Sequence, residues 1–261
     1  MEPILFQIII PFVLSALIVI LITVIAEKYG TKVGGILGTL PSTIVIAFIF
    51  ITFNKGLVFA SRSAAVVPAE MGINIIFLVF FVIIIKRGIW IATVFSLFIW
   101  SIMSSVLYFV NLENLYISVI IFVSSTVVSF LFLEKILKIK STGSVKVVYT
   151  KQKIIMRGIL AGLIIAISVL LSNVGAVLSG ICSVFPAIFL STMLISAYEH
   201  GPKFVGGMAK AMIIGSLSVT SYAIVISVLY PIYGIIWGTV IAYGVAVMIT
   251  FLLMGLRSWI E

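Results

Sequence analysis

Long apolar runs, separated by short polar segments, fill almost the whole chain. Each run is about 20 residues long, which is the length that an α-helix needs to cross the hydrocarbon core of a bilayer. The pattern therefore predicts nine transmembrane helices. The runs cover residues 3–26, 33–53, 63–85, 88–110, 115–133, 154–172, 177–198, 206–229 and 232–254.

One polar segment is much longer than the others. It covers residues 134–153, is rich in lysine, and lies between the fifth and sixth runs. We expect it to divide the chain into a four-helix unit at 1–112, a linking helix with a basic cytoplasmic loop at 113–153, and a second four-helix unit at 154–261.

Lysine and arginine are distributed unequally between the two sides of this arrangement. Only Lys55 and Arg62 follow even-numbered helices. The others follow odd-numbered helices or lie just inside the next helix: Lys28, Lys32, Lys86, Arg87, Lys135, Lys138, Lys140, Lys146, Lys151, Lys153, Arg157, Lys203, Lys210 and Arg257. Because basic loops stay in the cytoplasm, the sequence predicts a plasma-membrane protein with its N-terminus outside and its C-terminus in the cytoplasm.

Composition supports this interpretation and excludes other classes of protein. Apolar residues make up 63% of the chain and charged residues 9%, which is typical of a multispanning membrane protein and not of a soluble domain. The net charge of +9 is a topology signal, so we expect the lipid bilayer as a partner and no nucleic acid. With one histidine, one cysteine and seven dispersed acidic residues, we expect no metal site, no cofactor and no enzymatic activity. Oligomerisation stays open.

The chain also repeats itself at a constant offset of 145 residues. The recurring pairs are Gly30 and Gly175, Gly35 and Gly180, Ile36 and Ile181, Pro41 and Pro186, Gly56 and Gly201, and Phe59 and Phe204. Helices 1 to 4 then correspond to helices 6 to 9. Because one unpaired helix separates the copies, the second enters the membrane from the opposite face, so the predicted fold is an all-α integral membrane protein with two inverted four-helix repeats. One miscounted span would make the repeats parallel.

Each copy combines a stripe of small residues with a proline. Small residues recur every fourth position in both copies, which allows close helix packing: Gly30, Gly34 and Gly38, then Gly175, Ser179 and Ser183. Pro41 and Pro186 follow these stripes and are expected to interrupt their helices. Interrupted helices at matching positions of two halves indicate a transporter's binding site, although glycine and proline also serve packing alone in membrane helices.

The two copies resemble a known family of small membrane proteins. Residues 35–41 with Asn54-Lys55-Gly56, and residues 180–186 with Glu199-His200-Gly201, follow the pattern of the GlpM (YdgC) family of four-helix proteins. The resemblance implies that each half corresponds to one dual-topology family member and that the chain is a fused, duplicated pair. The first half departs from the pattern because it lacks the acid that Glu199 supplies. The resemblance implies an architecture rather than an activity.

Glu70 is the one acid predicted well inside a span. It lies eight residues after Arg62, about 12 Å deep at 1.5 Å per residue, and an ionisable group at that depth indicates a functional site. We expect it to bind a proton or a cation, with the Asn74 amide as a neighbouring ligand. The alternative is that the third helix begins near Met71, which would leave Glu70 at the interface.

Other polar residues have a structural and a functional interpretation. Ser42, Thr43, Ser191 and Thr192 either hydrogen-bond the carbonyls freed by the prolines or contact substrate. Glu199 and His200, at the cytoplasmic end of the seventh helix, are expected at the interface, with a proton relay as the weaker hypothesis. Trp100, like most tryptophans here, is assigned to an interfacial aromatic belt.

Three functions fit these features. The first is a transporter or permease for an unidentified small solute or ion, with its site at the broken helices around Pro41 and Pro186 and with coupling through Glu70. The second is an ion channel built from the same repeats. The third is a membrane scaffold that assists assembly of the cell envelope and moves no solute.

Overall fold

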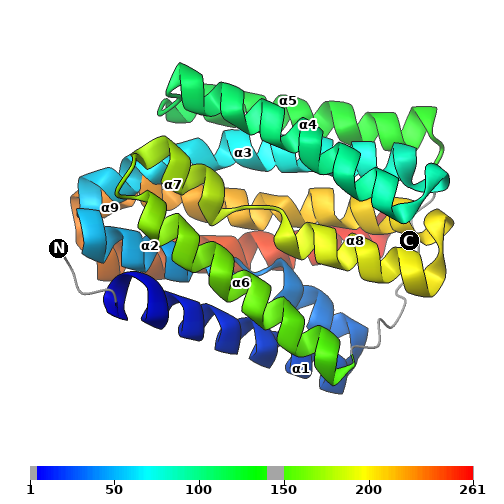
Figure 1. Cartoon of the computed structure of the whole chain (residues 1–261), viewed down its shortest axis with the longest axis horizontal. Helices are drawn as coiled ribbons and strands as arrows, with labels where there is room; N and C mark the ends of the chain where they lie inside the picture. The colour runs from blue at the N-terminus through cyan, green and yellow to red at the C-terminus, as the bar shows by residue number, and fades with distance from the viewer. Residues whose placement is uncertain (1–4, 140–149, 261) are drawn as a thin grey trace.

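The described chain is a bundle of helices that run roughly along one direction (Figure 1). The structure is a computed structural model. It describes residues 5–139 and 150–260, and the side chains within those ranges apart from residues 5–6, 25–39, 203 and 254–260. The helices in chain order are η1 (Leu5–Ile9), α1 (Ile10–Thr39), α2 (Ser42–Lys55), α3 (Leu57–Ile84), η2 (Ile85–Arg87), α4 (Ile89–Val110), α5 (Leu115–Leu131), η3 (Phe132–Ile136), α6 (Lys151–Leu171), α7 (Ala176–Ser183), α8 (Ala187–His200) and α9 (Pro202–Ile260).

Several of these helices have the length and composition of membrane spans, as the sequence predicts. Among the described residues, 7 helical stretches qualify: Gln7–Val24, Leu57–Arg87, Ile89–Val110, Leu115–Ile136, Lys151–Leu171, Ala176–His200 and Phe204–Leu253. The last stretch holds two helices that meet at Gly234, where the backbone leaves the helical conformation with a φ of 73°. The α2 helix is apolar but only 14 residues long.

The two predicted interruptions are present, and both lie at the prolines. Leu40 and Pro41 separate α1 from α2, and the segment from Val184 to Pro186 separates α7 from α8. A proline has no N–H to donate and its ring crowds the preceding turn, so the regular hydrogen-bond ladder stops there.

The local geometry at the two breaks is closely matched. The Ser42 N–H donates to the Leu40 carbonyl at 2.8 Å, and the Ala187 N–H donates to the Phe185 carbonyl at 2.8 Å. The helices that follow, α2 and α8, each have 14 residues. Both end at a glycine with positive φ, 85° at Gly56 and 79° at Gly201, a conformation that explains why glycine recurs at this position.

The third helix begins earlier than predicted. The expected start was residue 63, whereas α3 begins at Leu57, directly after Gly56. Its first turns carry polar side chains that find partners on other elements: the Ser61 hydroxyl donates to the Ser227 carbonyl, and Arg62 pairs with Glu113. These contacts allow a polar sequence to stay helical at the end of the span.

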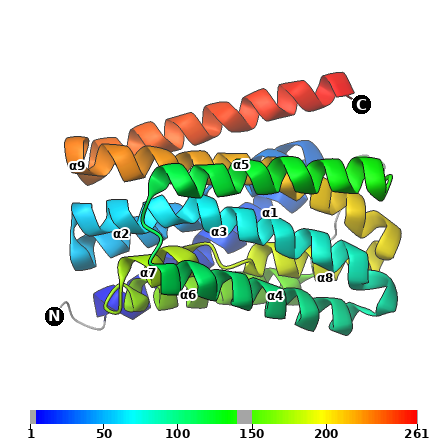
Figure 2. The same ribbon diagram turned by 90° about the horizontal axis from the view of Figure 1, so that it is seen from above.

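The α3 helix is the centre of the bundle. It packs against α4, α5, α7 and α9, and most of its side chains are buried (Figure 2). Its partners α7 and α9 come from the second predicted unit, and one hydrophobic cluster includes buried residues of both units. The described parts of the two units therefore share a single core.

Small residues allow backbones to approach closely in this core. A Cβ added at Gly162 would lie 2.6 Å from the Phe12 carbonyl oxygen, where α6 packs against α1. At Gly180 an added Cβ would overlap the Ser63 carbonyl oxygen, where α7 packs against α3. Ser179 and Ser168 each donate to the other's carbonyl at 2.9 Å, which joins α7 to α6. Of the second predicted stripe, Ser179 joins two helices, whereas an added Cβ at Gly175 would meet nothing within 4 Å and Ser183 bonds the Gly180 carbonyl of its own helix. The first stripe falls on residues whose side chains lie outside the described set.

The two ends of the bundle differ in charge. The η2 segment, the end of α5, the start of α6 and the junction of α8 with α9 meet at one end, which we call the basic end (Figures 1 and 2). Its described basic residues are Lys86, Arg87, Lys135, Lys138, Lys151, Lys153, Arg157 and Lys210. The junctions of α2 with α3, α4 with α5, and α6 with α7 lie at the other end, with Lys55 and Arg62. The marked chain termini also lie at opposite ends of the bundle.

Close packing of α7 on α3 predicts a strong effect of one methyl group. We expect Gly180→Ala to destabilise the fold by about 1–3 kcal/mol, the usual cost of overpacking, because the new Cβ overlaps backbone rather than a flexible side chain. Gly244→Ala is the matched control, since an added Cβ there meets nothing within 4 Å. Thermal unfolding in detergent, followed by circular dichroism, compares the two. Equal midpoints would contradict the packing described for Gly180.

Candidate functional site

Glu70 lies near the middle of α3 and is fully buried. It follows Leu57 by 13 residues and precedes Arg87 by 17, which places it about 20 Å and 26 Å along the helix from those ends. Its exposed fraction is 0%. The alternative that Glu70 sits at the membrane interface is therefore wrong, because the helix begins well before it.

One carboxyl oxygen of Glu70 has a partner and the other has none. The Ser104 hydroxyl, on α4, donates to Oε1 at 2.8 Å. Oε2 is buried without a hydrogen-bond partner in the described part of the chain. An unsatisfied oxygen in a closely packed interior is costly, so this atom is the natural place for a proton or a bound ion.

Asn74 lies one helical turn after Glu70 and connects three segments. Its side chain is 1% exposed. The Trp100 indole N–H donates to Asn74 Oδ1 at 2.8 Å, and Asn74 Nδ2 donates to the Val184 carbonyl at 2.7 Å. In a continuous helix that carbonyl would accept from the N–H four residues later, but α8 begins only at Ala187. Asn74 therefore satisfies a carbonyl that the Pro186 break leaves without its helical partner.

An aromatic contact closes the same cluster. The rings of Trp100 and Phe185 meet edge to face, with centroids 4.9 Å apart and planes at 79°. The break between α7 and α8 is thus held to α4 by ring packing and to α3 by a hydrogen bond. Asn74 thus lies at the Pro186 break, and Glu70 lies one helical turn before it on α3.

The electrostatics of the cluster favour a neutral Glu70. The ion pairs among the described residues lie elsewhere, and none of them involves Glu70. An unpaired carboxylate at this depth costs several kcal/mol. The site is therefore suited to a protonated carboxyl, or to a carboxylate neutralised by a small cation.

The remaining predicted site residues lie around the breaks rather than against Glu70. Pro41, Pro186, Ser191 and Thr192 are buried, and Ser42 and Thr43 are half-buried. The Ser191 hydroxyl donates to the Ile188 carbonyl at 3.1 Å, a bond within α8 rather than to a carbonyl freed by Pro186. None of the hydrogen bonds recorded for the described side chains joins these residues to Glu70.

Glu199 and His200 are far from Glu70, at the basic end. Lys153, at the start of α6, forms an ion pair with Glu199 at the end of α8, and His200 Nε2 lies 4.0 Å from Glu199 Oε2. The His200 ring also packs against Phe204, with centroids 4.7 Å apart. These contacts tie α6 to α8 at the basic end of the bundle.

Sequence reasoning missed Ser104, Trp100 and the Val184 carbonyl. Trp100 was assigned to an interfacial belt, but it is 8% exposed and lies midway along α4, so that assignment is wrong. The sequence of α4 does indicate this buried face, because small and polar residues recur along it at helical spacing. The buried face of α4 consists of Ala92, Thr93, Ser96, Trp100, Ser104 and Leu107.

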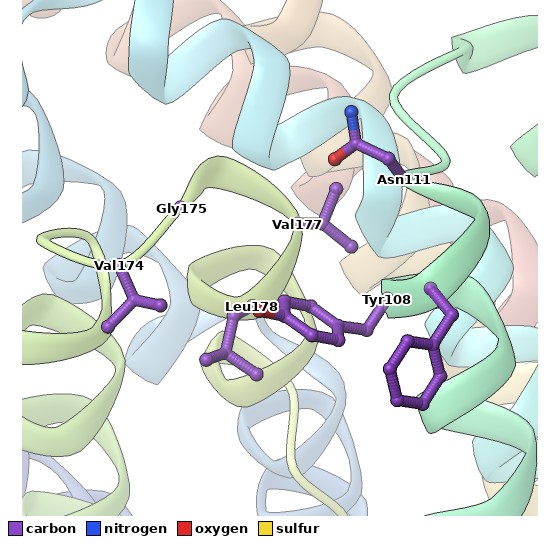
Figure 3. Close-up of a pocket in the computed structure, with 7 residues that line it drawn as sticks. Tyr108, Asn111, Val174, Gly175, Val177 and Leu178 are labelled. Carbon is purple, nitrogen blue, oxygen red and sulfur yellow. The ribbon is translucent and has the colours of Figure 1, made fainter.

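A cavity of about 410 Å³ lies between the end of α4 and the start of α7 (Figure 3). It is at the end of the bundle opposite the basic end. The lining residues are Tyr108, Phe109, Asn111, Val174, Gly175, Val177 and Leu178. Apolar side chains dominate this lining, and the phenol of Tyr108 and the amide of Asn111 supply its polar side-chain groups.

Comparison with known proteins gives one match. Residues 8–113 match the model of a family described as a protein of unknown function, DUF3147. No curated protein and no solved structure matches the chain. The matched segment nearly coincides with the first four-helix unit predicted at 1–112.

Because Asn74 and Trp100 share a hydrogen bond, the losses of folding stability caused by substituting each residue should be coupled. We expect Asn74→Leu to destabilise the fold strongly, because it leaves the Val184 carbonyl and the Trp100 N–H buried and unpaired, at about 1–3 kcal/mol for each group. Trp100→Phe alone should destabilise the fold less than Asn74→Leu does. Thermal unfolding of both single variants and the double variant measures the coupling. Strict additivity of the two losses would contradict a direct hydrogen bond between Trp100 and Asn74.

Proposed function

We propose that the chain is a plasma-membrane transporter or permease for a small solute or ion, coupled to a proton or cation through Glu70. The observation that carries the proposal is a carboxyl group buried near the middle of α3, with one unpartnered oxygen, beside a broken helix. Ionisable groups at such depth mark ion and proton pathways, and broken helices line the sites of secondary transporters.

An inverted repeat would give this site a mechanism. Two observations support an inverted repeat. The two breaks have equivalent hydrogen bonds and are followed by helices that end at glycines of the same conformation. The helices that the repeat would pair also pack against each other, α1 against α6 and α3 against α9. The α1 and α6 chains run in opposite directions in both views. Counting α1 and α2 as separate spans, α7 with α8 as one span, and α9 as two would give nine spans, arranged as the fused pair that the GlpM resemblance implies. Rocking one repeat against the other would then alternate access.

In an alternating-access protein one end is open while the other is closed, and the two ends of this bundle differ in the same sense. The cavity lies at one end, where Arg62 pairs with Glu113 in the segment between α4 and α5. Among the described residues, two ion pairs join helices at the other end: Lys153 with Glu199, and Lys210 with Glu134 at 3.5 Å. The excess of lysine and arginine at that closed end favours a cytoplasmic location for it. We therefore propose an outside N-terminus, a cytoplasmic C-terminus and a conformation that is closed on the cytoplasmic side.

A flux measurement with Glu70 variants tests the proposal. The protein is reconstituted in liposomes that contain a pH-sensitive dye, and a panel of small neutral and cationic solutes is added outside. We expect at least one solute to change the internal pH, with the signal lost in Glu70→Gln and partly kept in Glu70→Asp, because only a carboxyl exchanges the proton. An unchanged signal in Glu70→Gln would remove Glu70 from the mechanism.

The same assay separates the alternatives. Flux far above transporter turnover would favour the channel, although the complete burial of Glu70 provides no open pore at this site. Copurification with one envelope protein, without movement of any solute in the panel, would favour the scaffold.

The ion pair at the basic end predicts a charge-swap rescue. Lys153→Glu places two acids together and should loosen the contact between α6 and α8, which lowers flux and increases proton leak. The double variant Lys153→Glu with Glu199→Lys should restore both, since it re-forms the pair in reverse. The effect on stability should be small, about 0–1 kcal/mol, because both side chains are partly exposed. Failure of the double variant to recover flux would exclude the pair as a gate.

A further inference from the structure

The cavity and the buried Glu70 cluster share their walls. On α4, the cavity residues Tyr108 and Asn111 follow Ser104 by four and seven positions, so the three lie on one helix face. On α7, the cavity residue Val177 precedes Ile181 by four positions and the Val184 carbonyl by seven. Both faces therefore lead from the cavity to the groups that bind Glu70 and Asn74.

The separation along this path is short. Tyr108 and Ser104 are one turn apart, which is about 6 Å along α4. The Ser104 hydroxyl is itself within 2.8 Å of Glu70 Oε1. The carboxyl group thus lies roughly one helical turn and one hydrogen bond beyond the cavity.

A second unpartnered polar atom lies along the path. Ser63 is fully buried, and its hydroxyl has no hydrogen-bond partner in the described part of the chain. It precedes Glu70 by seven residues and so lies on the same face of α3. Its backbone contacts α7 at Gly180, between Val177 and Val184. A hydroxyl group can both accept and donate a proton in a hydrogen-bonded chain.

The packing between cavity and carboxyl excludes a larger ligand. Leu107 on α4 is 8% exposed, and Val177 and Ile181 on α7 are 2% and 3% exposed. A solute cannot pass between such side chains without separating the helices. A proton needs only hydroxyl groups and transient water, and this route offers the hydroxyls of Ser63 and Ser104.

We infer that Glu70 exchanges its proton with the aqueous phase at the cavity end, between α4 and α7 and along the Ser63 and Ser104 hydroxyls. On uptake, a hydronium ion in the cavity loses one proton and leaves as water, and a new O–H bond forms on Glu70 Oε2; release is the reverse. The inference rests on the proposed function, because it names the side of the membrane that serves the coupling site.

Infrared spectroscopy of the reconstituted full chain tests the route. The stretch of a protonated buried carboxyl, assigned by its loss in Glu70→Gln, shifts when the proton is replaced by deuterium. In a Cys182→Ser background, Val174→Cys places a thiol at the cavity, where a bulky thiol reagent blocks it. Ile117→Cys is the control, because it is exposed at the start of α5, at the same end but outside the cavity lining.

We expect modification of Val174→Cys to slow deuterium exchange at Glu70 severalfold and modification of Ile117→Cys to leave it unchanged. Equal exchange rates in both modified variants would overturn the route. A second comparison uses two fully buried serines with unpartnered hydroxyls. Ser63→Ala should slow exchange, whereas Ser96→Ala, on α4 beyond Ser104 from the cavity, should not; equal rates would again overturn it.

Solute flux, measured on the same samples, separates this inference from the proposed function. Blocked exchange without any solute movement would support the route and contradict transport. Solute-driven pH changes that persist after the cavity is blocked would support transport and contradict the route.

Discussion

A backbone carbonyl buried at membrane depth needs a hydrogen-bond donor, and the structure depends on how the Pro186 break meets this need. The donor for Val184 is the Asn74 amide, whose own oxygen accepts from Trp100. One amide therefore links α3, α4 and the segment between α7 and α8. Irregular backbone is tolerated inside a membrane protein only under such conditions, so the break could not lie against an apolar face of α3.

The same linkage determines the surroundings of Glu70. It lies one turn from Asn74, among helices that exclude water, and its Oε1 accepts from Ser104. Charging this group costs several kcal/mol, whereas each hydrogen bond that holds the break contributes about 1 kcal/mol. A change in the protonation of Glu70 therefore carries enough free energy to alter how the broken helix is held. In the proposed transport cycle, this difference in free energy would couple the protonation of Glu70 to movement of the break.

Features set by local chemistry were predictable from the sequence, and features set by tertiary contacts were not. The proline breaks, the helical fold and the position of Glu70 inside a span follow from residue type and run length. The early start of α3 was missed because its polar first turns are satisfied by Ser227 and Glu113, which are distant in sequence. Ser104 and Trp100 were missed because only the packing of α4 on α3 shows which α4 face is buried. The inverted arrangement and the function remain predictions.

The two halves contribute different parts of the site. The positions 145 residues after Glu70, Asn74 and Ser104 hold Gly215, Val219 and Ile249, so the second half has none of these polar groups. It supplies instead the Val184 carbonyl and the Phe185 ring. Two identical four-helix units would carry either two such carboxyl groups or none. In the proposed fused pair, a single carboxyl facing a single broken helix would require two different halves, and one chain would supply both halves to each site.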